Sequence, residues 1–428
     1  MRIAYMILDA GVGGHVRSAI TIGKNLVSKG IEIIFVVSQL QVPIDMDGGK
    51  YEVIKLGKHH KNFVFDFILL WKLFFILKRR SEKIDLIHAF DLHSYILGYF
   101  LSALLRVPCV STVCGGTIKY HYPYTKPVIV FSEELKETMT RKLGFAESEV
   151  IVEPARVEKI APKVFLNEGE FCTRISIDKH LKRIIMVSRI SLMKFSSIFF
   201  IIDVIENLAK KRKDFIFLLI GQIENRGVYD SLTKKIKDVN ARHGRPVVIL
   251  NHDLASIAAE CLKFADVVAG VGRVCWEGMS LMKPVIVIGE MGFAGLISPD
   301  LDRKQLKEIM YYNFSGRNIK CNDYDKSVKE TSNIIEQILD DVNFGKRCGK
   351  FGYKLFTRFY DVEKGVKSYY AVYSQLLNAK KKQKRDNVLY PLFGYMILLG
   401  GRLRMKIRNI DKYYLRKLRW NLFIGFIF

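Results

Sequence analysis

The stretch RIIMVSRISLMK, residues 183–194, starts as a buried strand and ends in a short polar turn that carries Arg189 and Lys194. On a helix or a strand, side chains five residues apart point in different directions, whereas around a turn they can converge on one ligand. Two converging cations match the charge of a diphosphate. The stretch therefore predicts an α/β sheet with a phosphate site beyond one of its strands.

A second stretch, ADVVAGVGRVCWEGMSLMKPVIVIGE at residues 265–290, supports this interpretation. It contains a strand, a glycine-containing turn, a helix with Glu277 and a further strand after Pro284. A carboxylate at this place can accept hydrogen bonds from the hydroxyls of a ribose. The alternatives are a carboxylate that only interacts with the helix dipole and, for Arg189 and Lys194, a solvated surface pair.

Apolar runs of strand length alternate with longer amphipathic stretches along most of the chain, a pattern typical of parallel sheets. We expect an α/β protein with two doubly wound Rossmann-like domains facing a cleft, at residues 1–160 and 161–350. Residues 351–378 are expected to close the first domain, and 379–428 to form a basic amphipathic C-terminal tail. The expected strands are residues 2–8, 32–37, 85–89, 109–113, 128–131, 183–188, 215–220, 247–250, 266–269 and 284–288.

The chain is strongly basic, with a formal net charge of +25 over 428 residues. Such a charge attracts nucleotides, nucleic acids or anionic lipid headgroups. No nucleic-acid recognition motif is present, so we expect no nucleic-acid partner. Seven cysteines without CxxC spacing indicate neither a zinc site nor a disulfide framework, and the first residues show no export signal. We therefore expect a cytoplasmic protein.

The first strand is followed by GVGGH at residues 11–15 and then by an amphipathic run. Glycines in this position let backbone N–H groups approach a phosphate at a helix N-terminus. The segment is not a complete GxGxxG fingerprint, so a plain turn is the alternative.

Together these motifs resemble the retaining glycosyltransferases of family 4, which have the two-domain GT-B architecture. VSRIS followed by MK is similar to the family's strand, Gly-Arg-Leu and Lys-Gly signature, and EGMSLMKP is similar to the segment around its second glutamate. The segments DLIHAFDLHS (85–94) and VPCVSTVCGGTIKY (107–120) resemble its paired N-terminal strands. The resemblance extends over about residues 1–378 and indicates the bacterial surface-polysaccharide type.

The resemblance implies a role for each matching residue. Arg189 and Lys194 are the expected catalytic cations, which hold the leaving diphosphate. Glu277 is expected on the ribose. Arg273 does not come from the family pattern; it lies in the loop before Glu277, and we expect it to supply a third cation to the donor. The donor-binding set is Gly13, Gly14, Gly272, Arg273 and Glu277, and the acceptor and sugar side is assigned to His15, His88 and Cys114.

Four positions depart from the family pattern. Ser188 and Phe195 stand where glycines are usual, and neither change removes a charge. The other two departures concern the transferred sugar. Ala269 stands eight residues before Glu277, where the family has a glutamate that touches the transferred sugar. Cys114 stands where many members have a histidine that faces this sugar, and a thiol is a weak hydrogen-bonding group. His88, His93 and His121 are candidate substitutes, although a lone histidine is more often structural.

The resemblance implies transfer of a sugar from a nucleotide diphosphate sugar, with retention, to a lipid-linked or glycan acceptor. The donor is a co-substrate, and we expect neither a cofactor nor a metal. Asp45 and Asp47 match an Asp-x-Asp metal pattern but precede a Gly-Gly pair, which favours a turn. The alternatives are a nucleotide-sugar epimerase of the same architecture and a non-catalytic or partner-dependent relative.

Two segments indicate contact with an anionic membrane surface. Residues 63–77, VFDFILLWKLFFILK, are apolar but too short to span a bilayer. The tail combines thirteen Lys or Arg and two Asp in residues 380–428 with aromatic and aliphatic residues. We therefore expect a peripheral protein on the inner face of the cell membrane; the alternatives are a packed helix and a tail that packs on the protein.

Overall fold

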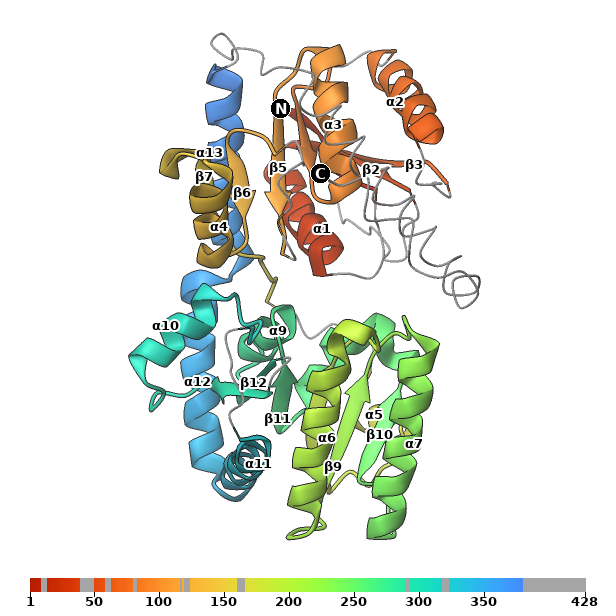
Figure 1. Ribbon diagram of the computed structural model, residues 1–428, viewed down its shortest axis with the longest axis vertical. Coiled ribbons are helices and arrows are strands. Elements are labelled where there is room, and N and C mark those ends of the chain that lie inside the picture. Colours follow the sequence, from red (N-terminus) through yellow and green to blue (C-terminus); the bar gives the residue numbers. More distant parts are fainter. Residues whose placement is uncertain are drawn as a thin grey trace, which may run out of the picture.

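The computed structural model describes residues 1–8, 14–38, 50–57, 63–79, 83–115, 118, 124–159, 166–289, 292–317 and 323–379. These residues form two α/β domains, one above the other along the longest axis of the molecule, each with a sheet between helices (Figure 1). The expectation of two Rossmann-like domains is confirmed. Of the tail expected at 379–428, only Ala379 is described, and residues 380–428 lie outside the described residues.

The N-terminal domain is built on a parallel seven-stranded sheet in the order β3-β2-β1-β4-β5-β6-β7. Successive side chains of a strand point to opposite faces. In β1, Ile3 and Tyr5 accordingly pack in one apolar cluster with α1 and α13, whereas Ala4 and Met6 pack in another with α2 and α3. The strands are β1 (Arg2–Ile7), β2 (Glu32–Val37), β3 (Tyr51–Lys55), β4 (Leu86–Ala89), β5 (Cys109–Val113), β6 (Val128–Val130) and β7 (Val150–Val152). The helices are α1 (Gly14–Val27), α2 (Phe63–Lys78), α3 (Leu92–Leu105), α4 (Glu133–Leu143) and, from the end of the chain, α13 (Val362–Ala379).

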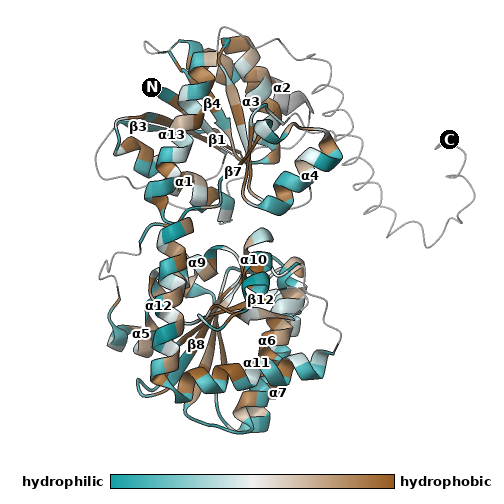
Figure 2. Ribbon diagram, turned by 90° about the vertical axis from the view of Figure 1, so that its left-hand side faces the viewer, coloured by the Kyte–Doolittle hydropathy of each residue, from teal (hydrophilic) through white to brown (hydrophobic). Residues whose placement is uncertain are grey.

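The C-terminal domain has a six-stranded sheet in the order β10-β9-β8-β11-β12-β13, in which only the described pair β12 and β13 is antiparallel. Hydrophobic strands lie between helices whose outward faces are hydrophilic (Figure 2). The strands are β8 (Lys182–Val187), β9 (Phe215–Ile220), β10 (Val248–Asn251), β11 (Val267–Gly270), β12 (Val285–Gly289) and β13 (Gly292–Leu296). The helices are α5 (Glu168–Arg174), α6 (Phe195–Ala209), α7 (Arg226–His243), α8 (Ala258–Cys261), α9 (Arg273–Ser280), α10 (Arg303–Tyr311), α11 (Tyr324–Asp340) and α12 (Val342–Phe359).

Each of the ten expected strands is present, with ends that differ by at most one residue. Three further strands, β3, β7 and β13, lie outside the expected set. β3 is an edge strand with charged residues at Glu52 and Lys55, and β7 has only three residues. β13 contains Gly292 and Gly295 at positive φ, which weakens its strand pattern.

The chain crosses between the domains at two adjacent places. Val157 and Asp361 form a parallel bridge, in which the Val157 N–H donates to the carbonyl of Tyr360 at 3.1 Å. Beyond this bridge α13 packs against α1, and the Tyr5 and Tyr373 hydroxyls lie 2.6 Å apart. The return to the first domain therefore starts at Val362 and not at residue 351, because α12 still packs on the C-terminal domain.

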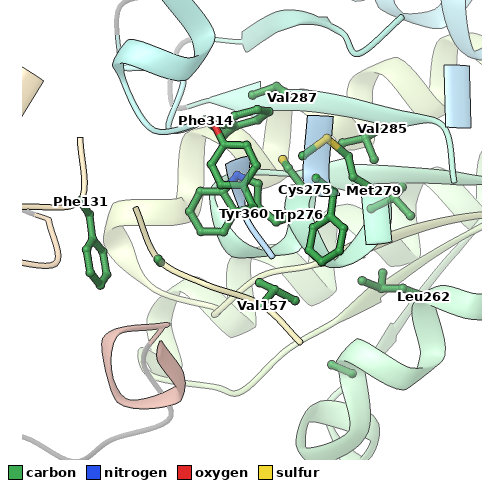
Figure 3. Close-up of a cluster of buried hydrophobic side chains, with 14 of the residues drawn as sticks. Phe131, Val157, Leu262, Cys275, Trp276, Met279, Val285, Val287, Phe314 and Tyr360 are labelled. Carbon is green, nitrogen blue, oxygen red and sulfur yellow. The ribbon is translucent and has the colours of Figure 1, made fainter. Parts of the chain in front are cut away.

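A buried aromatic cluster fixes α9 against the second crossing. The rings of Trp276 and Tyr360 are stacked with centroids 5.1 Å apart, and Phe314 lies at the edge of both (Figure 3). Met279 of the same helix packs on α12, where a Cβ at Gly352 would lie 3.0 Å from its Cγ. The cluster thereby holds the helix that carries Glu277.

His88 belongs to the core and not to the sugar side of a site, which corrects the expectation from the sequence. It lies on β4 with 0% of its surface exposed. Its Nδ1 lies 2.7 Å from the Tyr373 hydroxyl and its Nε2 lies 2.6 Å from the Thr112 hydroxyl, so both ring nitrogens are used. Burial holds the pKa of His88 well below its usual range.

We predict that Gly349→Ala destabilises the protein, because a Cβ at Gly349 would lie 1.9 Å from the carbonyl oxygen of Met282. The free energy of unfolding, measured by urea denaturation, should fall by about 1–3 kcal/mol. Gly227→Ala, at an exposed position of α7, is the matched control and should be neutral or stabilising by up to about 1 kcal/mol. Equal stabilities of the two variants would contradict the close packing of α12.

A second prediction concerns pH. Because the folded-state pKa of His88 is lowered, the unfolded chain binds a proton below about pH 6.5 that the folded protein does not bind. Stability should therefore fall with decreasing pH, by about 1.4 kcal/mol per pH unit from this residue. In His88→Asn this contribution to the slope should disappear in urea denaturation at pH 7.5, 6.5 and 5.5. His180→Asn, at an exposed histidine, is the control; an unchanged slope in His88→Asn would refute the assignment.

Candidate active site

A cavity of about 760 Å³ lies between the two domains. Residues just beyond β4 and β5 line it from the N-terminal domain, and residues beyond β8, β9 and β11 line it from the C-terminal domain. In open α/β sheets, ligands bind outside the carboxyl ends of the strands, as here. Of the described lining residues, five are cationic, namely Arg17, Arg189, Lys194, Arg273 and Arg317, and two are carboxylates, Asp91 and Glu277.

Arg189 and Lys194 line the same cavity, as the turn between them predicted. The segment after β8 lies alongside the segment after β9, because the Ile190 N–H donates to the carbonyl of Gln222 at 2.9 Å. Arg189 is 43% exposed and donates to Glu224 Oε1 at 2.9 Å. The close approach of these two segments requires a glycine at position 221, since a Cβ on Gly221 would lie 1.7 Å from the carbonyl oxygen of Ser188. The role of the two cations stays a prediction.

The turn from β11 to α9 brings Gly272, Arg273 and Glu277 to the cavity. Gly272 precedes the first turn of α9 with φ 58° and ψ −125°, a conformation that favours glycine. Glu277 is only 4% exposed, and its Oε1 accepts a hydrogen bond from Arg273 Nε at 2.7 Å. Among the described residues, no hydrogen bond joins a side chain to its second carboxylate oxygen, Oε2.

Arg273 has a different environment from that expected of a donor cation. Besides Glu277, its Nη1 donates to the carbonyl oxygen of Arg156 at 3.0 Å and to Ser18 Oγ at 3.4 Å. Its Nη2 donates to Thr21 Oγ1 at 3.4 Å. Ser18 and Thr21 belong to α1, so Arg273 connects the start of α9 with the N-terminal domain and holds the Glu277 carboxylate in place.

Ala269 does not lie at the cavity. It is a fully buried residue of β11 within the core of the C-terminal domain. Only Val271 and Gly272 separate β11 from α9, so the turn carries no acidic side chain in place of the family's first glutamate.

On the N-terminal side, Gly14 and His15 form the start of α1 and line the cavity, whereas Gly13 lies outside the described residues. A Cβ at Gly14 would meet nothing within 4 Å. The described part of the fold therefore does not require a glycine at this position, and the described residues leave the space beside it open.

Cys114 lines the cavity directly after β5. Its thiol makes only weak contacts, to the carbonyl oxygens of Phe90 at 3.8 Å and Thr112 at 3.6 Å. Burial and the nearby Asp91 raise the pKa of Cys114 well above its usual range. It therefore stays a neutral thiol and does not perform the role of a histidine; His93 is buried in α3, and His121 lies outside the described residues.

The structure adds cavity residues that sequence reasoning missed, notably Arg17, Asp91 and Arg317. Arg17 lies three residues after Gly14, one turn further along α1, and this spacing could have revealed it. Asp91 caps α3, where its Oδ1 accepts from the Ser94 N–H at 3.0 Å. Arg317 pairs with Glu134 of α4, a contact between distant segments that no local pattern shows.

No metal centre is present among the described residues, in the sense that no group of three or more His, Cys, Asp or Glu side chains is arranged to hold an ion. Asp45 and Asp47 lie outside the described residues. Independence from metal stays a prediction.

Most of the N-terminal domain is similar to a known protein family. Residues 12–154 match the family model described as Glycosyltransferase Family 4. No curated protein matches the chain.

Several solved structures are similar over most of the chain. A glycosyltransferase from Rickettsia africae is 16% identical with a TM-score of 0.64, covering 88% of this chain and 98% of its own. HepE of Anabaena, in complex with UDP and glucose, is 16% identical with a TM-score of 0.61, covering 88% and 100%. The sucrose-phosphate synthase of Thermosynechococcus elongatus is 17% identical with a TM-score of 0.58, covering 89% and 100%. At these identities the likeness shows the fold, which is the two-domain GT-B fold, and the family match shows that residues 12–154, most of the N-terminal domain, are similar to the family 4 glycosyltransferases.

Proposed function

We propose that the protein transfers a sugar from a nucleotide diphosphate sugar, with retention of configuration, to a lipid-linked or polysaccharide acceptor during assembly of a bacterial surface glycan. The observation that carries the proposal is the cavity, where Arg189, Lys194 and Glu277 of one domain face α1 of the other. The structures of HepE with UDP and glucose support a nucleotide sugar as donor.

In the proposed complex, Arg189 and Lys194 hold the diphosphate, and Glu277 Oε2 accepts a hydrogen bond from the ribose. The bond between the anomeric carbon and the phosphate oxygen breaks, and its electron pair stays on the leaving diphosphate. Fixed cations stabilise this growing charge more in the transition state than in the bound donor. The two cations are therefore the main catalytic groups of the proposal.

The acceptor hydroxyl forms its bond to the anomeric carbon on the face that the diphosphate leaves, which gives retention. Its proton goes to the leaving phosphate oxygen, so the reaction needs no base from the protein. This agrees with the environment of Cys114, because a partly buried neutral thiol does not accept a proton.

The N-terminal side of the cavity has the composition of a carbohydrate subsite. Phe90, Tyr95, Tyr124 and Phe131 line it, and the rings of Tyr95 and Tyr124 lie 5.8 Å apart. Asp91 provides a carboxylate beside these rings. Aromatic faces with a few polar groups are suited to sugar rings, which supports a glycan or lipid-linked glycan as acceptor.

A membrane-surface location has support from α2. Leu69, Leu73 and Leu77 pack into the domain, whereas Ile68, Trp71 and Phe75 lie on the opposite face and are 56%, 38% and 48% exposed. We define these three residues as the α2 stripe. The neighbouring Lys72 and Lys78 are exposed, and an apolar stripe flanked by cations is suited to an anionic lipid surface.

The α2 stripe would lie on the membrane and not cross it. Among the described residues, no helix has the length and apolar character that a crossing requires. We therefore propose a peripheral protein on the cytoplasmic face of the cell membrane.

The central prediction is tested with purified protein, a panel of nucleotide diphosphate sugars and detergent-solubilised bacterial lipid extract. Nucleotide release should depend on the extract, persist in EDTA and fall at least about 10²-fold in Arg189→Ala and Lys194→Ala. Arg242→Ala, an exposed arginine in the last turn of α7 and outside the cavity lining, should retain activity. Donor conversion without extract would favour an epimerase, and no turnover of any donor would refute the catalytic proposal.

The membrane prediction is tested by flotation with vesicles that contain anionic lipid. The double variant Trp71→Asp, Phe75→Asp should bind at least about tenfold more weakly, because two aromatic side chains no longer enter the interface. Tyr370→Ser removes a ring of similar exposure from α13 and is the control. Unchanged binding of the double variant would show that the α2 stripe does not contact lipid.

A further inference from the structure

Arg17 lies on the first turns of α1, partly buried, and lines the cavity. It shares a face of α1 with Gly14, Ser18 and Thr21. Because the Ser18 and Thr21 hydroxyls contact Arg273 at the start of α9, this face of α1 lies directly against the donor-binding domain. Arg17 is thus a cation of the N-terminal domain that faces the C-terminal domain.

Three of the described cavity arginines form ion pairs with carboxylates of the protein, and Arg17 is different. Arg189 pairs with Glu224, Arg273 with Glu277, and Arg317 with Glu134. Among the described residues, the guanidinium of Arg17 makes no hydrogen bond or ion pair. A partly buried cation without a partner is unfavourable, because desolvation is not compensated. An anionic ligand bound at this position would therefore compensate for the desolvation of the Arg17 guanidinium.

The surroundings of Arg17 disfavour its charge on balance. Burial lowers the pKa of Arg17, the nearby Glu277 partly opposes this, and Arg273 lowers it further. An anion bound between Arg17 and Arg273 would relieve both the loss of hydration and the repulsion between the two cations.

The neighbours of Arg17 also limit which anion fits. Glu277 is the proposed ribose contact, and Gly272 opens the start of α9 to the cavity. One turn before Arg17, the space beside Gly14 is open. A phosphate group there would meet the N-terminal ends of α1 and α9, whose dipoles both favour an anion.

We propose that Arg17 binds the diphosphate of the nucleotide sugar from the N-terminal domain, opposite Arg189 and Lys194, and is a third catalytic cation. The inference rests on the proposed function and extends it. The donor then connects the two domains through its leaving group, because α1 supplies one cation and the loop after β8 supplies two. A bidentate guanidinium suits this contact better than an ammonium group.

The first test is calorimetric and does not need turnover. Binding of uridine, guanosine, adenosine and thymidine diphosphates, and of the corresponding nucleosides, is measured for the wild type, Arg17→Ala, Arg17→Lys and Arg189→Ala. For the base that binds, Arg17→Ala should lose about tenfold to hundredfold in diphosphate affinity and keep its nucleoside affinity. Arg17→Lys should recover part of the loss. Lys24→Ala removes a cation from the last turn of the same helix, outside the cavity lining, and should bind as the wild type.

The second readout is turnover of the donor found in the panel experiment. Arg17→Ala should lower kcat by about 10²-fold or more, because the charge it stabilises grows as the leaving group departs. Diphosphate affinity that falls in Arg189→Ala but not in Arg17→Ala would overturn the role of Arg17 and leave the proposed function standing. Equal losses for nucleoside and diphosphate would show a structural role only. Failure of the wild type to bind any nucleoside diphosphate would overturn the proposed function as well.

Discussion

The buried guanidinium of Arg156 joins the two chain crossings, and the geometry of the site depends on it. Arg156 and Glu153 are 6% and 4% exposed and form an ion pair, and Arg156 Nη1 also donates to the carbonyl of Phe359 at the second crossing. The carbonyl of Arg156 itself accepts from Arg273. Loss of one partner of a buried pair leaves an uncompensated charge, so this connection strongly resists separation. Through Arg273 it also fixes the carboxylate of Glu277.

The opposite edge of the cleft is held by weaker contacts. Arg317 pairs with Glu134, and the Tyr311 hydroxyl donates to Glu137, so the two C-terminal-domain residues reach α4 of the N-terminal domain. Exposed ion pairs typically contribute about 0–1 kcal/mol. Separation of the domains would therefore break the contacts at α4 more easily than the buried connection at Arg156. Arg317 also lines the cavity, so a bound anion can compete with Glu134 for its charge.

The parts that were predictable from the sequence are those set by local patterns. Apolar runs predicted ten strands, and the turn between Arg189 and Lys194 placed both cations at one cavity because five residues suffice to define that geometry. His88 was assigned wrongly because the chain does not show that Tyr373, which is 285 residues away, covers it. The spacing of Arg17 from Gly14 is a local signal for a position beside the glycines, but only the structure shows that this face of α1 lies against α9 of the other domain.

The departures from the family pattern at Ala269 and Cys114 have the same consequence for the site. Ala269 is buried in β11, and Cys114 remains a neutral thiol, so neither position supplies a charged or basic group to the transferred sugar. The charge at the cavity comes mainly from cations, and Glu277, one of the described lining carboxylates, is paired with Arg273. Under the proposed function, stabilisation of the leaving diphosphate has to supply most of the lowering of the barrier, because these two positions offer little stabilisation to the sugar. The proposed cation Arg17 on the leaving group would then compensate for the sugar contacts that the family pattern implies and this sequence lacks.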